Sequence, residues 1–214
     1  MADKASRKKF LRKAVKPVEI KAGANVEDLV RRMGATAFQG RNLSTAVDIW
    51  EEMLKGRTTV FFGLAGAMIP AGMREVVTHL IENRYIDCLV STGANLFHDI
   101  HEELGRVHWQ GTHHMDDNLL KDMGIDRIYD VFALEEEFNA ADRYIYDMAE
   151  SLERRPYTTR EFLEEIGRDL SKRGKARGIV SAAFKAGVPI YCPAVADSSI
   201  GIALALKDGP GHFV

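Results

Sequence analysis

Apolar and polar positions along the chain follow two periods, and the clearest stretch is residues 58–99. Residues 58–64 and 85–90 are short apolar runs rich in β-branched and aromatic side chains, which predicts two buried strands. Between them, residues 73–83 have the spacing of an amphipathic helix. A strand, a helix and a second strand in this order predict a βαβ unit with parallel strands.

The same patterns assign elements to the rest of the chain. Residues 1–25 are polar and basic, which predicts a flexible N-terminal arm. Residues 38–43 are expected to be a break, after which Ser44 caps a helix that ends at Gly56. Further helices are predicted at residues 26–33 (with Asn25 as N-cap), 96–104, 118–123, 135–154, 158–172 (with a Thr158/Glu161 capping box) and 179–185, and further strands at residues 127–132 and 188–192.

Strands that alternate with helices predict one α/β domain over residues 26–214, with a mainly parallel sheet and helices on both faces. The 214 residues are 46% hydrophobic, enough for an ordinary core, and their net charge of −2 leaves no electrostatic footprint for nucleic acid. No apolar run approaches the roughly 20 residues that cross a membrane. Cys88 and Cys192 lie in apolar strand-like runs, so we expect reduced, buried thiols and a cytoplasmic protein.

Small residues follow three of the predicted strands, in the loops after Leu64, Val90 and Cys192. The carboxyl ends of parallel strands share one edge of a sheet, where backbone N–H groups can approach a phosphate. A nearby carboxylate, Asp99 or Asp197, can accept hydrogen bonds from a ribose. No Gly-x-Gly-x-x-Gly fingerprint is present. The spacing therefore leaves two interpretations open, a nucleotide site or simple tight turns.

Histidines and carboxylates are dense in the next segment: His98, Asp99, His101, His108, His113, His114, Asp116 and Asp117. The His98/His101 spacing and the adjacent pair His113 and His114 are candidate metal ligands. The alternative is that most of these histidines lie at the surface or make hydrogen bonds. His98 and Asp99 begin a predicted helix directly after a strand-end loop, which fits an acid–base or substrate-orienting role.

Nucleophiles give a weaker signal. Ser91, Ser198 and Ser199 lie in predicted loops, but no Gly-x-Ser-x-Gly elbow surrounds them, which argues against a hydrolase triad. No lysine has the apolar setting that would depress its pKa for catalysis.

Four short segments, spread over nearly the whole chain, share one likeness. They are residues 38–43 (Phe-Gln-Gly-Arg-Asn-Leu), 66–75 (Gly-Ala-Met-Ile-Pro-Ala-Gly-Met-Arg-Glu), 91–99 (Ser-Thr-Gly-Ala-Asn-Leu-Phe-His-Asp) and 192–201 (Cys-Pro-Ala-Val-Ala-Asp-Ser-Ser-Ile-Gly). Together they resemble deoxyhypusine synthase, in its archaeal and bacterial branch, and residues 124–130 fit the same pattern. The resemblance implies a Rossmann-like NAD-binding fold.

The resemblance also implies a reaction, an NAD-dependent aminobutyl transfer from spermidine. NAD accepts a hydride from the polyamine, an active-site lysine captures the butylimine, and the group passes to a lysine of a translation factor or to a free polyamine. The family forms homotetramers with the site between paired subunits. By motif, the NAD contacts fall on Gly66, Ala67, Met68, Ile69, Pro70, Thr92, Gly93, Ala94, His98 and Asp197.

Two departures from the family pattern qualify this expectation. Phe97 and His98 stand where animal enzymes carry paired glutamates, and Ile202 stands where they carry an aspartate that contacts the polyamine. We therefore expect Phe97 and His98 to bind the substrate. Desolvated ammonium groups need carboxylate partners, so these changes weaken the case for spermidine itself.

The second departure concerns the covalent step. The family's glycine-rich strand–loop with its histidine, and the Trp-Gly-Lys segment with the catalytic lysine, have no match among the 214 residues. We expect residues 26–214 to be an NAD-binding domain truncated relative to the family, without a catalytic residue and inactive alone. Residues 209–214 resemble a turn within a domain.

Three functional hypotheses remain open. The chain is the N-terminal portion of a deoxyhypusine synthase-like transferase that acts with a complementary C-terminal segment. Alternatively, it is a non-catalytic regulatory paralogue that binds a full-length partner, or a homospermidine synthase-like enzyme that uses another polyamine.

Overall fold

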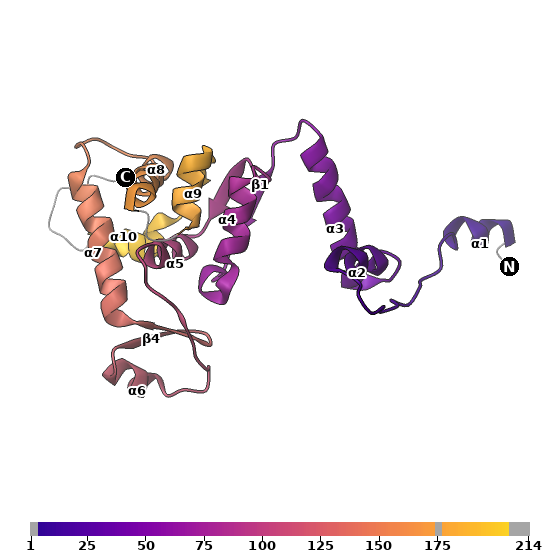
Figure 1. The fold of residues 1–214 in the computed structure, drawn as a ribbon, viewed down its shortest axis with the longest axis horizontal. Coiled ribbons are helices and arrows are strands. Elements are labelled where there is room, and N and C mark those ends of the chain that lie inside the picture. Colours follow the sequence, from indigo (N-terminus) through magenta and orange to yellow (C-terminus); the bar gives the residue numbers. More distant parts are fainter. Residues whose placement is uncertain (1–3, 174–176, 206–214) are drawn as a thin grey trace. The chain divides into compact units, whose positions relative to one another are not determined.

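The computed structural model describes residues 4–173 and 177–205. The chain divides into two compact units, Met1–Thr58 and Thr59–Val214, whereas we expected a boundary near residue 25. Figure 1 traces both units. Residues 209–214, expected to form a turn within a domain, lie outside the described residues.

The first unit contains helices α1 (Lys4–Phe10), α2 (Val26–Met33) and α3 (Phe38–Lys55) among its described residues. Helix α2 begins as predicted, because the Asn25 side chain accepts the backbone N–H of Asp28 at 2.8 Å. The break predicted at residues 38–43 is wrong, since α3 already begins there. Ser44 is buried inside α3, where a Cβ on Gly34 would lie 2.7 Å from its Oγ. Close packing of α2 on α3 thus overrides the weak local helix signal.

The second unit is built on a parallel sheet of β1 (Phe61–Leu64), β2 (Cys88–Ser91) and β6 (Ile190–Tyr191), in the order β1-β2-β6. Strands β1 and β2 are joined by a single helical turn, η1 (Ile69–Met73), and by α4 (Arg74–Glu82). This confirms the predicted βαβ unit. All three strands are parallel, so their carboxyl ends share one edge of the sheet, as expected.

Helices pack around this sheet and give the α/β class predicted from the sequence: α5 (Gly93–Glu103), α8 (Thr159–Arg173), α9 (Ile179–Ala186), the 3-10 turn η2 (Val195–Asp197) and α10 (Ser199–Ala205). Helix α5 begins three residues earlier than predicted because Thr92 caps it. The Thr158/Glu161 capping box is confirmed: Glu161 Oε2 accepts the Thr158 N–H at 2.8 Å, and Thr158 Oγ1 accepts the Glu161 N–H at 3.2 Å.

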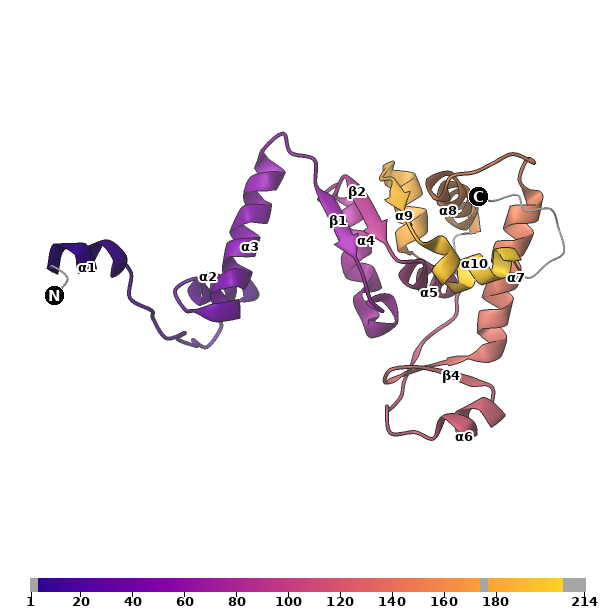
Figure 2. The same ribbon diagram turned by 180° about the vertical axis from the view of Figure 1, so that it is seen from behind.

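A second, antiparallel sheet consists of β3 (Trp109–Gln110), β4 (Ile125–Ile128) and β5 (Val131–Leu134), in the order β3-β5-β4, with α6 (Asp117–Asp122) beside it. The single strand predicted at residues 127–132 is wrong, because Tyr129 and Asp130 form a hairpin turn there. Tyr129 has a φ of 56°, a conformation that usually signals glycine or asparagine. Figures 1 and 2 show this sheet and α6 at the N-terminal end of α7 (Glu135–Ser151), away from α8.

The core of the second unit is apolar and continuous from the sheet to the helices. Fully buried side chains include Ile69, Ile81, Leu89, Leu96 and Ile166. Cys88 and Cys192 are free, buried thiols, as expected. Within the described part of the chain, no helix combines the length and apolar character needed to cross a bilayer.

Candidate functional site

One fully buried side chain, Asn95, ties the loops after β1 and β2 together. Its Oδ1 accepts the backbone N–H of Ile69 at 3.3 Å, and its Nδ2 donates to the carbonyl of Leu64 at 3.3 Å. Ser91 Oγ donates to the same carbonyl at 3.1 Å. These bonds hold the loop after β1 against the first turn of α5. The carboxyl edge of the sheet is therefore held together by hydrogen bonds within the chain.

The backbone of this edge is open at Gly66. The residue is exposed with a φ of +70°, and a Cβ placed on it would meet no atom within 4 Å. The positive φ calls for glycine, yet no described residue fills the space beside it. Thr92 and Ala94 are also exposed, at the N-terminus of the eleven-residue helix α5. The unpaired N–H groups of a helix N-terminus attract anions.

The third loop closes on the same turn of α5. A Cβ on Gly93 would lie 2.2 Å from Ser198 Oγ, so glycine is required for this close packing. Ser198 Oγ in turn donates to the carbonyl of Val195 at 2.6 Å, which fixes η2. Asp197 is exposed at the end of η2. Its carboxylate is available to accept hydrogen bonds from a hydroxylated ligand.

The residues expected to bind NAD thus separate into two sets. Exposed or half-buried on the three loops are Gly66, Ala67, Met68, Thr92, Ala94 and Asp197, while Ile69, Pro70, Gly93 and His98 are buried. The first set offers backbone groups and one carboxylate, which is the donor and acceptor set that a dinucleotide requires. The buried residues of the second set pack beneath the loops, and Ile69 is fully buried.

Asp99 does not belong to this edge, and its interpretation as a ribose ligand is wrong. It is fully buried, and its two carboxylate oxygens accept the backbone N–H groups of Ile179 at 2.9 Å and Val180 at 2.8 Å, at the start of α9. One turn further on, Glu103 accepts the N–H of Ser181 at 3.0 Å. Burial, and then the charge of Glu103, raise the pKa of Asp99. The pair fixes α9 to α5.

His98 and His101 lie in a buried aromatic cluster with His108 and Phe138. The centroid of the His98 ring lies 4.9 Å from that of His108 and 5.5 Å from that of Phe138. The centroid of the His101 ring lies 5.0 Å from that of His108 and 4.9 Å from that of Phe138. Burial lowers the pKa of His98 to about 4 and that of His101 to about 3. Both imidazoles are therefore neutral at pH 7.

A chain of polar contacts leads out of this cluster. His98 Nδ1 lies 2.9 Å from His108 Nε2, and His108 Nδ1 lies 2.7 Å from Glu102 Oε1. Glu102 Oε2 lies 2.8 Å from Arg74 Nε on α4. Sequence patterns did not single out Asn95, Glu102 or Arg74. The one available signal was the position of Asn95 and Arg74 within the quoted motifs.

The carboxylates of the same histidine-rich segment, Asp116 and Asp117, have partners within the chain. Asp116 caps α6 by accepting the N–H of Asn118 at 2.9 Å, and Asp117 pairs with Arg127 at 2.6 Å. His113 and His114 are exposed, with ring centroids 3.8 Å apart. Within residues 4–173 and 177–205, no group of three or more histidine, cysteine or acidic side chains is arranged to hold a metal ion.

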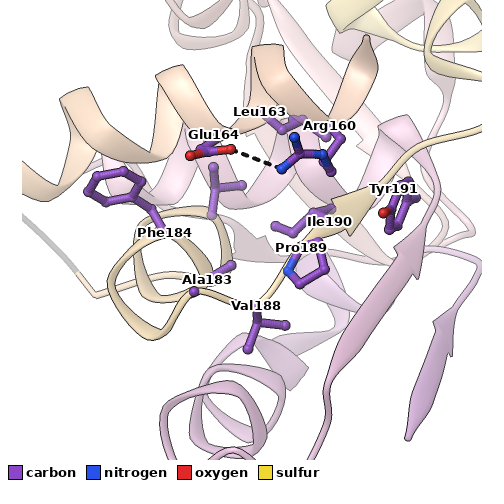
Figure 3. Close-up of a pocket in the computed structure, with 11 residues that line it drawn as sticks. Arg160, Leu163, Glu164, Ala183, Phe184, Val188, Pro189, Ile190 and Tyr191 are labelled. Carbon is purple, nitrogen blue, oxygen red and sulfur yellow. Dashed lines mark hydrogen bonds and ion pairs between the residues drawn. The ribbon is translucent and has the colours of Figure 1, made fainter. Parts of the chain in front are cut away.

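A separate pocket of about 320 Å³ lies beside β6, and none of the expected cofactor residues lines it. Its walls come from α8, α9 and residues 187–191. Figure 3 shows Arg160 and Glu164, an ion pair of 3.1 Å on α8, above Pro189 and Ile190. The pocket is mostly apolar and was not indicated by any sequence motif.

Comparison with known proteins gives one consistent result. A family model described as deoxyhypusine synthase matches residues 28–213. The chain is 50% identical over 192 residues to Probable deoxyhypusine synthase 2 of Methanosarcina acetivorans, covering 89% of this chain and 55% of that protein. It is 54% identical over 177 residues to the protein of the same name from Archaeoglobus fulgidus, covering 81% and 58%. The chain thus spans about half the length of these curated relatives.

Among solved structures, a "putative deoxyhypusine synthase" from Entamoeba histolytica matches with a TM-score of 0.68 and 19% identity, over 94% of this chain and 70% of that chain. At this identity the likeness shows the fold alone.

Proposed function

The chain belongs to the deoxyhypusine synthase family, and from this premise we propose that its parallel sheet holds NAD for an aminobutyl transfer from a polyamine. The observation that carries the proposal is the convergence of three small-residue loops at the carboxyl edge of the sheet. Asn95 ties two of them together, and the contact between Gly93 and Ser198 brings in the third.

Each part of this edge has a role in the proposal. The open backbone at Gly66 and the first turn of α5 face the pyrophosphate, because unpaired N–H groups at a helix N-terminus favour anions. The exposed carboxylate of Asp197 accepts hydrogen bonds from a ribose. When bound, NAD supplies the hydride acceptor, and the residues of this chain hold and orient it.

We place the polyamine beside Phe97 and His98. Spermidine is the family's expected donor, and a lysine of a translation factor or a second polyamine is the acceptor. The assembly in this proposal is a cytoplasmic homotetramer, and a complementary C-terminal segment completes the site. Since the 214 residues contain no Trp-Gly-Lys segment, they bind NAD in this proposal without turning over alone.

Binding of NAD to the 214-residue chain tests the proposal by isothermal titration calorimetry. We expect Asp197→Ala to weaken binding about tenfold, which corresponds to the loss of one charge-assisted hydrogen bond. The matched control is Asp122→Ala, which removes an exposed carboxylate on α6. Equal affinities for the two variants, or no binding of NAD by the parent chain, would contradict the proposed site.

A turnover assay tests the second half of the proposal. We expect that the chain alone releases no diaminopropane from spermidine in the presence of NAD. Release by this chain alone would show that it carries out the covalent step, and would contradict the proposal.

A specific observation favours one alternative donor. His98 is neutral at pH 7 and Phe97 is apolar, so neither side chain offers a negative charge to an ammonium group. A homospermidine synthase-like enzyme that uses a less cationic amine is the second candidate. Putrescine and agmatine, compared with spermidine as donors in the completed assembly, distinguish the two candidates.

A further inference from the structure

Four polar side chains form a continuous path from α4 to the middle of α5. The path runs from Arg74 through Glu102 and His108 to His98, and its three contacts are 2.8, 2.7 and 2.9 Å long. Only the side chains of Arg74 and Glu102 reach solvent appreciably, with 18% and 17% exposure. Burying polar side chains costs free energy unless each of them has a hydrogen-bond partner. Each contact of the path therefore needs one donor and one acceptor, and this requirement decides which nitrogen of each histidine carries the proton.

The direction is set at Glu102. Its Oε2 pairs with the Arg74 guanidinium, so the carboxylate is ionised and can only accept hydrogen bonds. His108 Nδ1 must therefore carry the proton that Glu102 Oε1 accepts. Because Arg74 already balances the charge of Glu102, we take His108 as the neutral imidazole. Its Nε2 is then an acceptor, and the proton of the next hydrogen bond belongs to His98 Nδ1.

His98 is left with one unprotonated nitrogen, Nε2. Among the described residues this atom has no hydrogen-bond partner. It is also not one of the fully buried atoms without a partner, so it is in contact with solvent. The rings of Phe97 and Phe138 lie 5.8 and 5.5 Å from the His98 ring, edge to face, which restricts its rotation. The lone pair on Nε2 therefore has a fixed direction and access to solvent.

His101 provides the internal contrast. It lies in the same cluster, yet neither of its fully buried ring nitrogens is bonded to another side chain among the described residues, and its polar neighbour besides Glu137 is the backbone of Val107. The closest carboxylate, Glu137 Oε2, lies 3.9 Å from its Nε2. Membership of the cluster alone does not orient a histidine, whereas the path through Glu102 orients His98.

We propose that Glu102 is a positioning residue: through His108 it keeps the proton of His98 on Nδ1, so that Nε2 accepts a hydrogen bond from an amine N–H of the donor substrate. The assignment of the ligand rests on the proposed function. The assignment of the proton does not, because it follows from the contacts within the chain and from a neutral His108.

Nitrogen-15 NMR of the imidazole rings in the full 214-residue chain at pH 8 tests the proton assignment. We expect His98 as the Nδ1–H tautomer. In Glu102→Leu and His108→Phe we expect a mixture of tautomers, or the Nε2–H form. His113→Gln removes an exposed histidine outside the path and should leave the His98 resonances unchanged. Circular dichroism identifies any variant that fails to fold, and Glu102→Asp, which keeps the carboxylate, should restore the parent tautomer in part.

A parent chain with His98 as the Nε2–H tautomer, or as the imidazolium, would overturn the role of Glu102. So would a folded Glu102→Leu chain whose His98 tautomer is unchanged. Neither result depends on NAD.

Titration with NAD and then with spermidine tests the ligand. We expect the His98 Nε2 resonance to shift when spermidine is added, and spermidine binding to weaken about three- to tenfold in Glu102→Leu. If NAD binds but spermidine leaves the His98 resonance unmoved, the ligand assignment fails while the cofactor site stands. If NAD does not bind, the proposed function fails and the ligand assignment with it, and the tautomer still decides the role of Glu102.

Discussion

Helix α5 carries buried titratable side chains on two faces, and the protein uses the two faces differently. On one face, Asp99 has both carboxylate oxygens occupied by backbone N–H groups of α9. On the other, His98 has one nitrogen engaged by His108 and a second nitrogen without a hydrogen-bond partner among the described residues. Both side chains are buried with perturbed pKa values, so perturbation alone does not mark a binding site. The free hydrogen-bonding capacity that remains distinguishes them.

The two faces also respond to pH in opposite directions. The pKa of Asp99 is raised above 3.8 in the folded chain, so the folded state binds more protons there and stability falls as pH rises. The pKa of His101 is lowered from 6.5 to about 3. Between these values the unfolded state binds more protons, so stability falls as pH drops through 6.5.

The largest effect is expected from a substitution at Asp99, on the face of α5 that packs against α9 (the carboxylate face). Asp99→Ala removes the acceptor of two buried N–H groups, and each unsatisfied group costs about 1–3 kcal/mol. We expect a loss of about 2–5 kcal/mol in the free energy of unfolding, measured by urea denaturation. Asp197→Ala, at an exposed aspartate, should stay within about 0.5 kcal/mol of the parent chain. A loss below about 1 kcal/mol for Asp99→Ala would show that α9 is held by other contacts.

A smaller effect is expected where the backbone at Gly178 lies close to Glu103, on the same face of α5. A Cβ on Gly178 would lie 2.2 Å from Cγ of Glu103, which is buried and hydrogen-bonded to Ser181. We expect Gly178→Ala to destabilise the fold by about 1–3 kcal/mol, as overpacking does. Gly63→Ala is the matched control, because a Cβ on Gly63 meets nothing within 4 Å. Equal midpoints of thermal unfolding for the two variants would argue against a rigid contact at Glu103.

The pH response gives a third prediction. Glu103→Gln keeps an oxygen for the Ser181 N–H and removes the like charge that helps to raise the pKa of Asp99. We expect the variant to be more stable than the parent by about 1 kcal/mol at pH 8, with little difference at pH 4. Urea denaturation across this range measures the slope, and parallel curves for the two proteins would contradict the coupling.

The smallest effect is expected from a substitution at His101, on the face of α5 that carries His98 and His101. Neither ring nitrogen of His101 has a well-aligned hydrogen bond among the described residues, and the backbone of Val107 offsets only part of the cost of burying the ring. An apolar replacement therefore removes an unfavourable burial. His101→Met should change the stability by less than about 1 kcal/mol at pH 7. It should gain on the parent as pH falls to 5, because the unfolded parent then binds a proton that the folded parent does not. A loss above about 2 kcal/mol would reveal a hydrogen bond that His101 makes in solution.

The features that the sequence predicted correctly depend on residues close together in the chain. Asn25 caps α2 and the Thr158/Glu161 box caps α8, because each signal lies within three residues of its partner. The parallel strands and their common edge followed from short apolar runs that end in small residues. The residues expected on that edge remain predictions as NAD contacts.

The features that the sequence did not predict depend on distant partners or unusual backbone. Asp99 was grouped with the strand ends because its partners on α9 lie about 80 positions further along the chain. The hairpin at Tyr129 was missed because its positive φ occurs without glycine or asparagine. The path from Glu102 to His98 was missed because His108 reaches it from an irregular segment with no periodic signal.

The register of the parallel sheet has a consequence for how the chain folds as it is made. Strand β2 finds β1 across one short helix, but its other partner, Ile190 opposite Leu89, is synthesised about a hundred residues later. At roughly 5–20 residues per second, β2 emerges with an open hydrogen-bonding edge for about 5–20 seconds. During translation this edge is open to wrong pairing, and a chaperone that shields extended apolar strands would protect it.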